Sequence, residues 1–337
     1  MEKSNVSANA GSFVNVHDNV LSAIGNTPIV RLNKCVPTGK HQFFGKVEFF
    51  NPGGSVKDRI AMAIIEDAEK RGELKPGGTI VEATSGNTGV GLGLVGLLKG
   101  YKCVFVMPEK ISEEKRAVLR AYGAKVVMTP TGLEPEDPNS HYSVAKRIVA
   151  ETPGAYLANQ YNNPANVLVH YQTTGPEIWK QMAGQIDVFV GGIGTGGTLS
   201  GVGRYLKEQN KNVKIVCSDP IGSILYDLFY FKEVRDPAKS YLVEGIGEDM
   251  LPDNVHFQYM DDFVRVTDAE SFKACRDLAA KEGLLVGPSC GAALAAAIKY
   301  SEKLEKPSKI LVIFPDGGRS YLSKAFNEGW LKEKGLN

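Results

Sequence analysis

Short apolar runs alternate with longer amphipathic stretches along most of the chain. Runs such as residues 79–82, 103–107 and 309–314 are bounded by turn-forming or charged residues, which is typical of buried strands. Residues 60–71 instead place apolar side chains at helical spacing and end at Gly72. Short buried strands that alternate with helices are typical of parallel sheets covered on both faces, so the sequence predicts an α/β fold.

The same pattern predicts further elements along the chain. Residues 43–50 form a strand-like run, and residues 226–244 are the least periodic part of the second half, which favours a loop. The other predicted helices are 90–99, 112–122, 141–151, 171–182, 202–209, 267–282 and 292–303, and the other predicted strands are 29–32, 125–128, 187–190 and 214–217.

Composition and charge narrow the classes of function. The chain has 337 residues and a net charge of +1, which argues against a general nucleic-acid-binding protein, because such a protein needs a basic face. The longest apolar run, 89–98, is too short to span a bilayer, and residues 1–19 lack the apolar core of a secretory signal. We therefore expect no nucleic-acid or membrane partner.

The cysteines and histidines give no sign of a metal site or a disulfide framework. Five cysteines are dispersed without a C-x-x-C pair, which is typical of reduced thiols in the cytoplasm. Five histidines are equally scattered, so no metal-ligand spacing is present and no metal is expected.

A lysine follows a tight turn at the predicted start of a helix. Residues 51–59 (NPGGSVKDR) place Lys57 after a Pro-Gly-Gly turn, where the partial positive charge of a helix N-terminus is unfavourable for an ammonium group. That placement, together with burial, should lower the pKa of Lys57 and leave a nucleophilic amine. A solvated lysine near a helix cap is the ordinary alternative.

A glycine-rich segment lies between a predicted strand and a predicted helix. Residues 191–198 (GGIGTGGT) can fold tightly and direct backbone N–H groups toward an anion, which favours a phosphate ligand. Gly192, Gly194 and Gly197 also fit G-x-G-x-x-G, and Asp219 follows about 20 residues later, so a dinucleotide site is an alternative. A third alternative is a glycine-rich turn without a ligand.

A second loop of small polar residues also precedes a predicted helix. Residues 84–89 (TSGNTG) combine hydroxyl and amide donors with backbone N–H groups, and such a loop can bind a carboxylate. An N-capped turn explains the same residues.

Together these motifs carry a resemblance to a known family. Residues 51–59, 84–89, 194–198 and Ser289 occur in the order and spacing of the fold type II enzymes that use pyridoxal phosphate. Over residues 20–330 the chain resembles the cystathionine β-synthase and cysteine synthase family, and is most similar to the catalytic core of the cystathionine β-synthases. The latter similarity rests on residues 48–51, 107–110, 222–225, 244–247 and 315–321.

Two residues depart from the pattern of the cystathionine β-synthases. Pro52 is the form more usual in cysteine synthases, and Glu248 stands where some cystathionine synthases carry an aromatic residue. The haem segment of the animal enzymes and their C-terminal regulatory domain pair have no counterpart here, so haem sensing and activation by adenosylmethionine are not expected.

The resemblance implies a role for each motif residue. Lys57 would carry the cofactor covalently and act as the catalytic base, Asn87 would hold the ring hydroxyl oxygen, and Ser289 would bond the ring nitrogen. A neutral serine there favours loss of a β leaving group over transamination. The implied phosphate contacts are Gly194, Thr195, Gly196, Gly197 and Thr198, and the implied substrate contacts are Thr84, Ser85, Gly86, Thr88, Gln160, Tyr161, Gly245, Glu109 and Lys324.

The resemblance also implies a domain organisation. The expected fold is two three-layer α/β domains with mostly parallel sheets, similar to the β subunit of tryptophan synthase. Residues 14–50 and 158–337 would form the larger domain that binds the cofactor, and residues 51–157 a smaller mobile domain. Residues 1–13 would be a disordered lead-in, and relatives imply a homodimer.

The implied activity is pyridoxal 5′-phosphate-dependent β-replacement on serine, or an activated serine, by a thiol. Serine and homocysteine would give cystathionine, as in transsulfuration, with hydrogen sulfide release from cysteine as a further reaction. The alternative within the family is a cysteine synthase, which makes cysteine from O-acetylserine and sulfide. Outside it, a Rossmann dehydrogenase and a non-catalytic sensor that keeps the fold remain alternatives.

Overall fold

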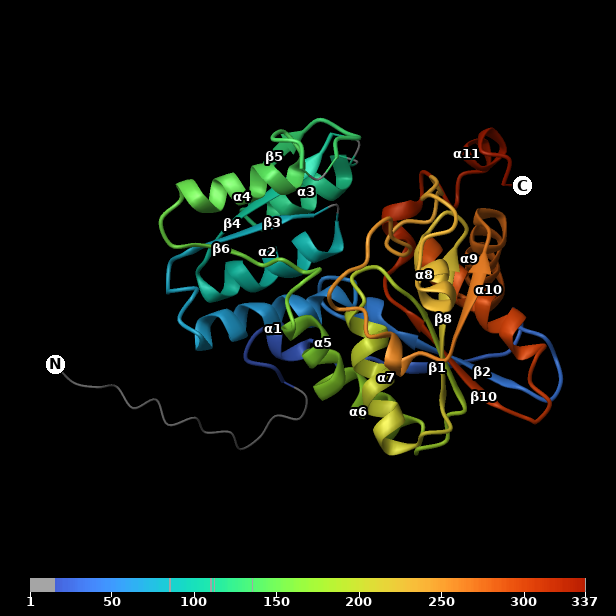
Figure 1. Cartoon of the computed structure of the whole chain (residues 1–337). Coiled ribbons are helices and arrows are strands. Elements are labelled where there is room, and N and C mark those ends of the chain that lie inside the picture. The colour runs from blue at the N-terminus through green and yellow to red at the C-terminus, as the bar shows by residue number, and fades with distance from the viewer. Residues whose placement is uncertain (1–15, 85, 110, 112, 135, 337) are drawn as a thin grey trace.

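The computed structural model describes residues 16–84, 86–109, 111, 113–134 and 136–336. Figure 1 shows two sheets with their helices, one carried mostly by the first half of the chain and the other mostly by the second. The predicted lead-in 1–13 and the candidate residue Ser85 lie outside the described residues.

The larger sheet has six strands in the order β1-β2-β10-β7-β8-β9. Its strand pairs are parallel except for β1 and β2, which pair in the antiparallel direction. The strands are β1 Ile29–Leu32, β2 Gln42–Val47, β7 Val188–Gly192, β8 Lys214–Pro220, β9 Asp262–Val266 and β10 Lys309–Phe314.

The smaller sheet has four parallel strands in the order β5-β4-β3-β6. The strands are β3 Thr79–Ala83, β4 Lys102–Pro108, β5 Lys125–Thr129 and β6 Ala155–Leu157. The α-helices are α1 Lys57–Lys70, α2 Asn87–Lys99, α3 Glu113–Ala121, α4 His141–Glu151, α5 Ala165–Val169, α6 Gly175–Gln181, α7 Gly197–Gln209, α8 Leu225–Phe231, α9 Asp268–Glu282, α10 Pro288–Ser301 and α11 Glu328–Glu333.

Helices cover both faces of each sheet, because successive residues of a strand point to opposite sides. In β7, Val188 and Val190 pack with α9 and α10, whereas Phe189 packs with α6 and α7. In β3, Ile80 packs with α1 and α2, whereas Val81 packs with α4. The predicted α/β class with mostly parallel sheets is therefore confirmed.

Several elements differ from the sequence prediction. The run 43–50 is strand only to Val47, and a 3-10 turn, η2 Glu48–Phe50, follows it. The predicted helix 171–182 begins with a π-helical turn, η3 His170–Thr174, before α6. The short helix α5 and the strand β9 were not predicted, and α8 occupies the start of the predicted loop 226–244. Elements of five to seven residues are too short to show a clear periodicity.

The five cysteines are unpaired. Cys103, Cys217, Cys275 and Cys290 are buried, and Cys35 is half-buried. Burial raises the pKa of Cys35, Cys103 and Cys275 to about 12. Among the described residues, no helix has the length and apolar character needed to cross a membrane, and no cluster of three metal-ligating side chains occurs.

Candidate active site

A cavity of about 390 Å³ lies between elements of the two sheets. Its walls come from the segments that follow the carboxyl ends of β2, β3 and β7, the edge where parallel α/β sheets bind their ligands. Ten of the residues predicted to form the site line it: Lys57, Thr84, Gly86, Asn87, Thr88, Gln160, Tyr161, Gly194, Thr195 and Gly245.

Lys57 is the first residue of α1, which confirms its predicted place at the start of a helix, although the apolar periodicity begins only at Ile60. Burial lowers the pKa of its ammonium group, and the charges of Asp316 and Glu248 oppose this effect. No hydrogen bond or ion pair of its Nζ is found among the described residues. The preceding segment is fixed to the larger sheet, since the Val56 N–H donates to the Pro315 carbonyl oxygen at 2.8 Å.

The loop that contains Thr84 joins the end of β3 to the start of α2. The Gly86 N–H donates to Thr84 Oγ1 at 3.3 Å, and no side chain caps the helix at Gly86. Thr88 Oγ1 donates to Gln160 Oε1 at 2.5 Å, so two predicted substrate contacts are directly bonded. Backbone N–H groups at the start of α2 are therefore available to an anion.

The turn before α7 brings backbone close to backbone. Gly196 has a φ of 89°, which only glycine adopts without strain, and no side chain caps the helix there. A Cβ at Gly194 would lie 2.6 Å from the Gly245 carbonyl oxygen, so a larger residue would not fit. Of the predicted phosphate contacts, Gly194 and Thr195 line the cavity, and Gly196, Gly197 and Thr198 continue the turn beyond its lining.

Two carboxylates missed by the sequence prediction lie close to Lys57. Asp316 accepts hydrogen bonds from Asn87 Nδ2 at 2.8 Å and from the Tyr321 hydroxyl at 2.7 Å, and burial raises its pKa. Glu248 lines the cavity, and burial raises its pKa to about 8 although a Tyr161 hydrogen bond opposes the shift. Both residues belong to motifs compared above, but nothing local in the sequence indicated their contacts.

The remaining candidates lie at different distances from the cavity. Ser289 is 5% exposed in the first turn of α10 and does not line it. Glu109 is exposed at the end of β4, outside the lining. Lys324 borders an adjoining cavity of about 340 Å³ and pairs with Glu244, which also pairs with Lys115 of α3.

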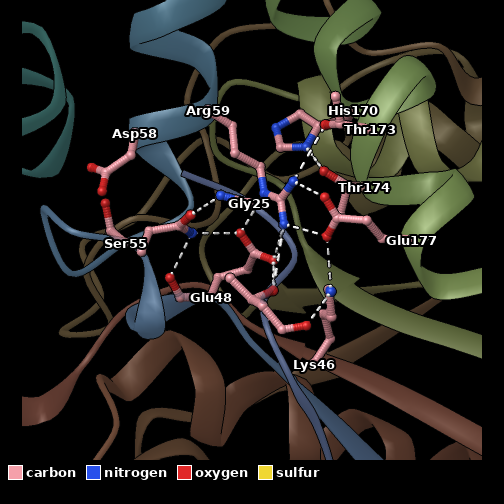
Figure 2. A network of polar contacts seen from close by, with 12 residues as sticks. Gly25, Lys46, Glu48, Ser55, Asp58, Arg59, His170, Thr173, Thr174 and Glu177 are labelled. Carbon is pink, nitrogen blue, oxygen red and sulfur yellow. Dashed lines mark hydrogen bonds and ion pairs between the residues drawn. The ribbon is translucent and has the colours of Figure 1, made fainter. Parts of the chain in front are cut away.

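A buried polar network fixes α1 next to the site (Figure 2). The Arg59 guanidinium donates to both carboxylate oxygens of Glu48 and of Glu177, at 2.7–3.0 Å. Lys46 Nζ also contacts Glu177, at 3.0 Å. Arg59 and Lys46 hold the pKa of Glu177 down at about 2 although burial opposes this. Charged groups from α1, β2, η2 and α6 thus neutralise one another.

His170 connects this network with the turn before α7. Its Nδ1 lies 2.9 Å from Thr174 Oγ1, and its Nε2 lies 3.2 Å from Thr198 Oγ1. Burial lowers the pKa of His170 well below its usual range, and the charges of Arg59 and Lys57 add to the effect.

Comparisons with known proteins agree on one family. Residues 20–316 match the family described as pyridoxal-phosphate dependent enzyme. The cystathionine beta-synthase of Apis mellifera is 46% identical over 329 residues, 97% of this chain and 64% of that protein. The cystathionine beta-synthase of Mus musculus is 46% identical over 319 residues, 94% of this chain and 56% of that protein. The chain thus spans less than two thirds of the length of these relatives.

Two solved structures share the fold. A hydrogen sulfide-producing enzyme from Fusobacterium nucleatum is 36% identical, with a TM-score of 0.84, and the match covers 91% of this chain and 100% of that one. O-ureido-L-serine synthase is 37% identical, with a TM-score of 0.85, and the match covers 94% of this chain and 99% of that one.

Proposed function

Because the chain belongs to the family of pyridoxal-phosphate dependent enzymes, we propose that it catalyses β-replacement on serine, or an activated serine, by a thiol. The favoured reaction is that of serine with homocysteine to give cystathionine. The observation that carries this proposal is the single cavity that joins Lys57, the loop before α2 and the turn before α7.

The cofactor of this family is pyridoxal 5′-phosphate, and the described residues fit it. Lys57 offers an amine with a lowered pKa and without a partner among the described residues. The glycine turn offers uncapped N–H groups on a backbone that passes too close to the Gly245 carbonyl oxygen to admit a Cβ at Gly194. These observations support Lys57 as the point of covalent attachment and residues 194–198 as the phosphate contacts. Once bound, the cofactor withdraws electrons from the substrate α-carbon.

The chain's own residues then bind the substrate and move its proton. Thr84, Thr88 and the N–H groups at the start of α2 would hold the substrate carboxylate, and Gln160 orients Thr88. The Lys57 amine, poised by burial, would remove the α-proton and later return it. Asn87, oriented by Asp316, would hold the ring hydroxyl oxygen. Ser289 would be an uncharged partner of the ring nitrogen, which favours loss of the β leaving group.

The side of the cavity that receives the thiol is formed by a different group of residues. Tyr161 and Glu248 line it together, and Gly245 lies at the border with the adjoining cavity. Lys324 forms an ion pair with Glu244, which lines both cavities. We propose these residues as the surroundings of the second substrate, whereas the exposed position of Glu109 gives it less support.

A product assay tests the proposed function. The purified protein is incubated with serine or O-acetylserine and with homocysteine or sulfide, and the products are identified by mass spectrometry. Cystathionine formation with the highest kcat/KM from serine and homocysteine supports the proposal. Cysteine formation with the highest kcat/KM from O-acetylserine and sulfide would favour the cysteine synthase alternative, and no replacement product from any pair would overturn both.

The alternative keeps specific support from the solved structures. The two neighbours are a hydrogen sulfide-producing enzyme and an O-ureido-L-serine synthase, which supports products other than cystathionine for this fold. Hydrogen sulfide release from cysteine therefore belongs in the same assay.

Replacing Lys57 tests the central residue. Lys57→Ala should reduce product formation by at least about a hundredfold, because the base and the covalent attachment are both lost. Borohydride reduction followed by peptide mapping should label Lys57 in the wild-type protein alone. Lys70→Ala, at the exposed end of the same helix, is the control. Wild-type turnover in the Lys57 variant would contradict the assignment.

We also propose a homodimer in the cytoplasm, with the smaller domain at 51–157 and the larger domain at 14–50 and 158–337. Unpaired cysteines support a reducing compartment. A hollow of about 490 Å³ along α1 and α5, with Leu21, Met62 and Leu168 in its walls, supports a covering partner. Light scattering coupled to size-exclusion chromatography would measure the mass, and a monomer at micromolar concentration would contradict the dimer.

A further inference from the structure

The π-helical turn η3 packs closely against α7, the helix that begins at the glycine turn. A Cβ at Gly201 would lie 2.7 Å from the Cβ of His170, so glycine permits this approach. His170 and Thr174 are buried, at 1% and 0% exposure. Single π-helical turns inside α-helices frequently occur at functional sites, and the proposed reaction assigns no role to this one.

The ring of His170 has one threonine hydroxyl at each nitrogen. Thr174 Oγ1 lies 2.9 Å from Nδ1, and Thr198 Oγ1 lies 3.2 Å from Nε2. The buried imidazole next to two cationic groups is uncharged, since its pKa lies well below the usual range. It therefore carries one N–H, either at Nδ1 or at Nε2.

The two tautomers have different consequences for Thr198. If Nδ1 carries the proton, Nε2 must accept the hydroxyl hydrogen of Thr198, and that hydrogen is then lost to any ligand. If Nε2 carries the proton, it donates to Thr198 Oγ1, Thr174 donates to Nδ1, and the hydroxyl hydrogen of Thr198 remains free. Hydrogen bonds to an anion are roughly twice as strong as neutral ones, so an anion at the turn favours the second arrangement.

We propose that His170 is a positioning residue for the phosphate-binding turn, in which Nε2–H donates to Thr198 Oγ1 and thereby directs the Thr198 hydroxyl hydrogen to the phosphate. This inference rests on the proposed function, which places the cofactor phosphate at residues 194–198.

The same contacts connect the phosphate turn with the helix that carries Lys57. Arg59 Nη1 donates to Thr173 Oγ1 at 3.3 Å, and Thr173 donates to the Val169 carbonyl oxygen, so the π-helical turn is held from the α1 side (Figure 2). His170, in the same π-helical turn, contacts Thr198 of α7. The phosphate contacts and the cofactor lysine are thus fixed by one buried framework.

The first test measures how tightly the holoenzyme retains its cofactor, by equilibrium dialysis of variants. His170→Leu should weaken retention about tenfold, the effect of one hydrogen bond. His170→Gln keeps a donor near the position of Nε2 and should stay close to wild type, whereas the shorter His170→Asn cannot reach Thr198 and should behave like the leucine variant. Tyr171→Phe removes a hydroxyl of the same turn that bonds Glu208 and should change nothing.

A double variant separates positioning from general destabilisation. Thr198→Val alone should weaken retention, and His170→Leu should add nothing to it, because the histidine acts through this hydroxyl. Additive losses, or equal behaviour of the glutamine and asparagine variants, would overturn the role of His170. Unchanged retention in Thr198→Val would also overturn that role, whereas a wild-type protein that retains no pyridoxal 5′-phosphate would overturn the phosphate site of the proposed function.

The second test observes the tautomer in the unaltered protein and so does not depend on how variants fold. Nitrogen-15 NMR of the histidine-labelled holoenzyme should show His170 neutral, with Nε2 protonated and Nδ1 unprotonated. A proton at Nδ1 would overturn the proposal, even where phosphorus-31 NMR shows the phosphate bound.

Discussion

Glu82 shows how a single buried carboxylate can hold a functional turn. It is 3% exposed in β3 and accepts hydrogen bonds from the backbone N–H groups of Asn159, at 2.7 Å, and Gln160, at 3.3 Å. Gln160 in turn accepts from Thr88. Burial raises the pKa of Glu82 to about 7 although both backbone donors oppose the shift. The geometry of residues 84–89, the loop proposed to bind the substrate carboxylate, therefore depends on a group that titrates near neutral pH.

Glu82 should give the protein a specific pH dependence of stability. Its pKa rises from 4.5 in the unfolded chain to about 7 when folded, so the folded state binds the proton more tightly. Stability present below pH 4.5 is then lost as the pH rises through 7, by up to about 3 kcal/mol.

Urea unfolding of wild type and Glu82→Gln between pH 5 and 8 measures this dependence. The glutamine variant differs from the wild type only in lacking the titration of Glu82. The wild-type free energy of unfolding should therefore fall relative to that of the variant as the pH rises. A difference that stays constant or moves the other way would contradict the assignment.

The contacts of single residues were the part of the site least accessible to sequence reasoning. The lowered pKa of Lys57 was predicted in direction from its place at a helix start and its burial, and burial is the largest cause. Asp316 was not predicted, since its hydrogen bond with Asn87 joins residues 229 positions apart. Hydrophobic periodicity reports which face of an element is buried, but not which distant side chain it meets.

At the scale of elements, α1 is held by charges as well as by its apolar face. Ile60, Ile64 and Ala68 pack on the smaller sheet, whereas Arg59 lies among carboxylates near β2 and α6. Removing one member of a buried ion network leaves the others uncompensated, which costs more than the loss of the contact itself.

Arg59→Met should therefore be strongly destabilising. The free energy of unfolding should fall by roughly 3–5 kcal/mol, because Glu48 and Glu177 would lose their common partner. Arg71→Met, at the exposed end of the helix, should cost less than about 1 kcal/mol, since its pairs with Asp67 and Glu73 are in solvent. Urea unfolding at constant pH compares the two, and equal losses would show that the network adds no stability.

Helix boundaries failed in the prediction where tertiary contacts decide them. The apolar spacing of 171–182 is helical throughout, yet the chain forms a π-helical turn at its start, where His170 and Thr174 bond each other beside α7. The start of α1 at Lys57 was predicted from the turn before it, but not the contact that fixes it, in which the Val56 N–H donates to the Pro315 carbonyl oxygen. Both boundaries depend on segments that lie far away in the sequence.

The architecture as a whole was the most predictable level. Alternating strands and helices indicated parallel sheets covered on both faces, and the structure confirms this, because that pattern repeats through most of the chain. Two features of the larger sheet were not predicted. One is the antiparallel pairing of the edge strand β1 with β2, and the other is the opposite edge strand β9, which pairs with β8. Edge strands show weaker apolar runs than central strands.

Charged side chains connect residues 51–157, here called the smaller lobe, with the rest of the chain across the cavity. Lys115 of α3 pairs with Glu244 at 2.7 Å, and Glu244 belongs to the segment between α8 and β9. Such partly exposed pairs contribute little energy and can open and re-form. This arrangement supports a movement of the part of residues 51–157 that lies beyond the start of α1, whereas the Arg59 network holds that start to η2 and α6.

Small-angle X-ray scattering of the holoenzyme tests that movement. Serine should reduce the radius of gyration, because a carboxylate bound at the start of α2 would draw the smaller lobe over the cavity. Thr88→Val removes a proposed carboxylate contact and should leave the profile unchanged at the same serine concentration. Identical profiles of the wild-type protein with and without serine would count against closure.

The burial of the cysteines has a consequence for a protein proposed to handle reactive sulfur. Four thiols lie inside the folded cores, and the fifth, Cys35, has its pKa raised to about 12, so at neutral pH hardly any thiolate is presented to the surroundings. Polysulfides and mixed disulfides then find hardly any thiolate on the resting molecule, and alkylation of the four buried thiols can proceed only as fast as the interior opens.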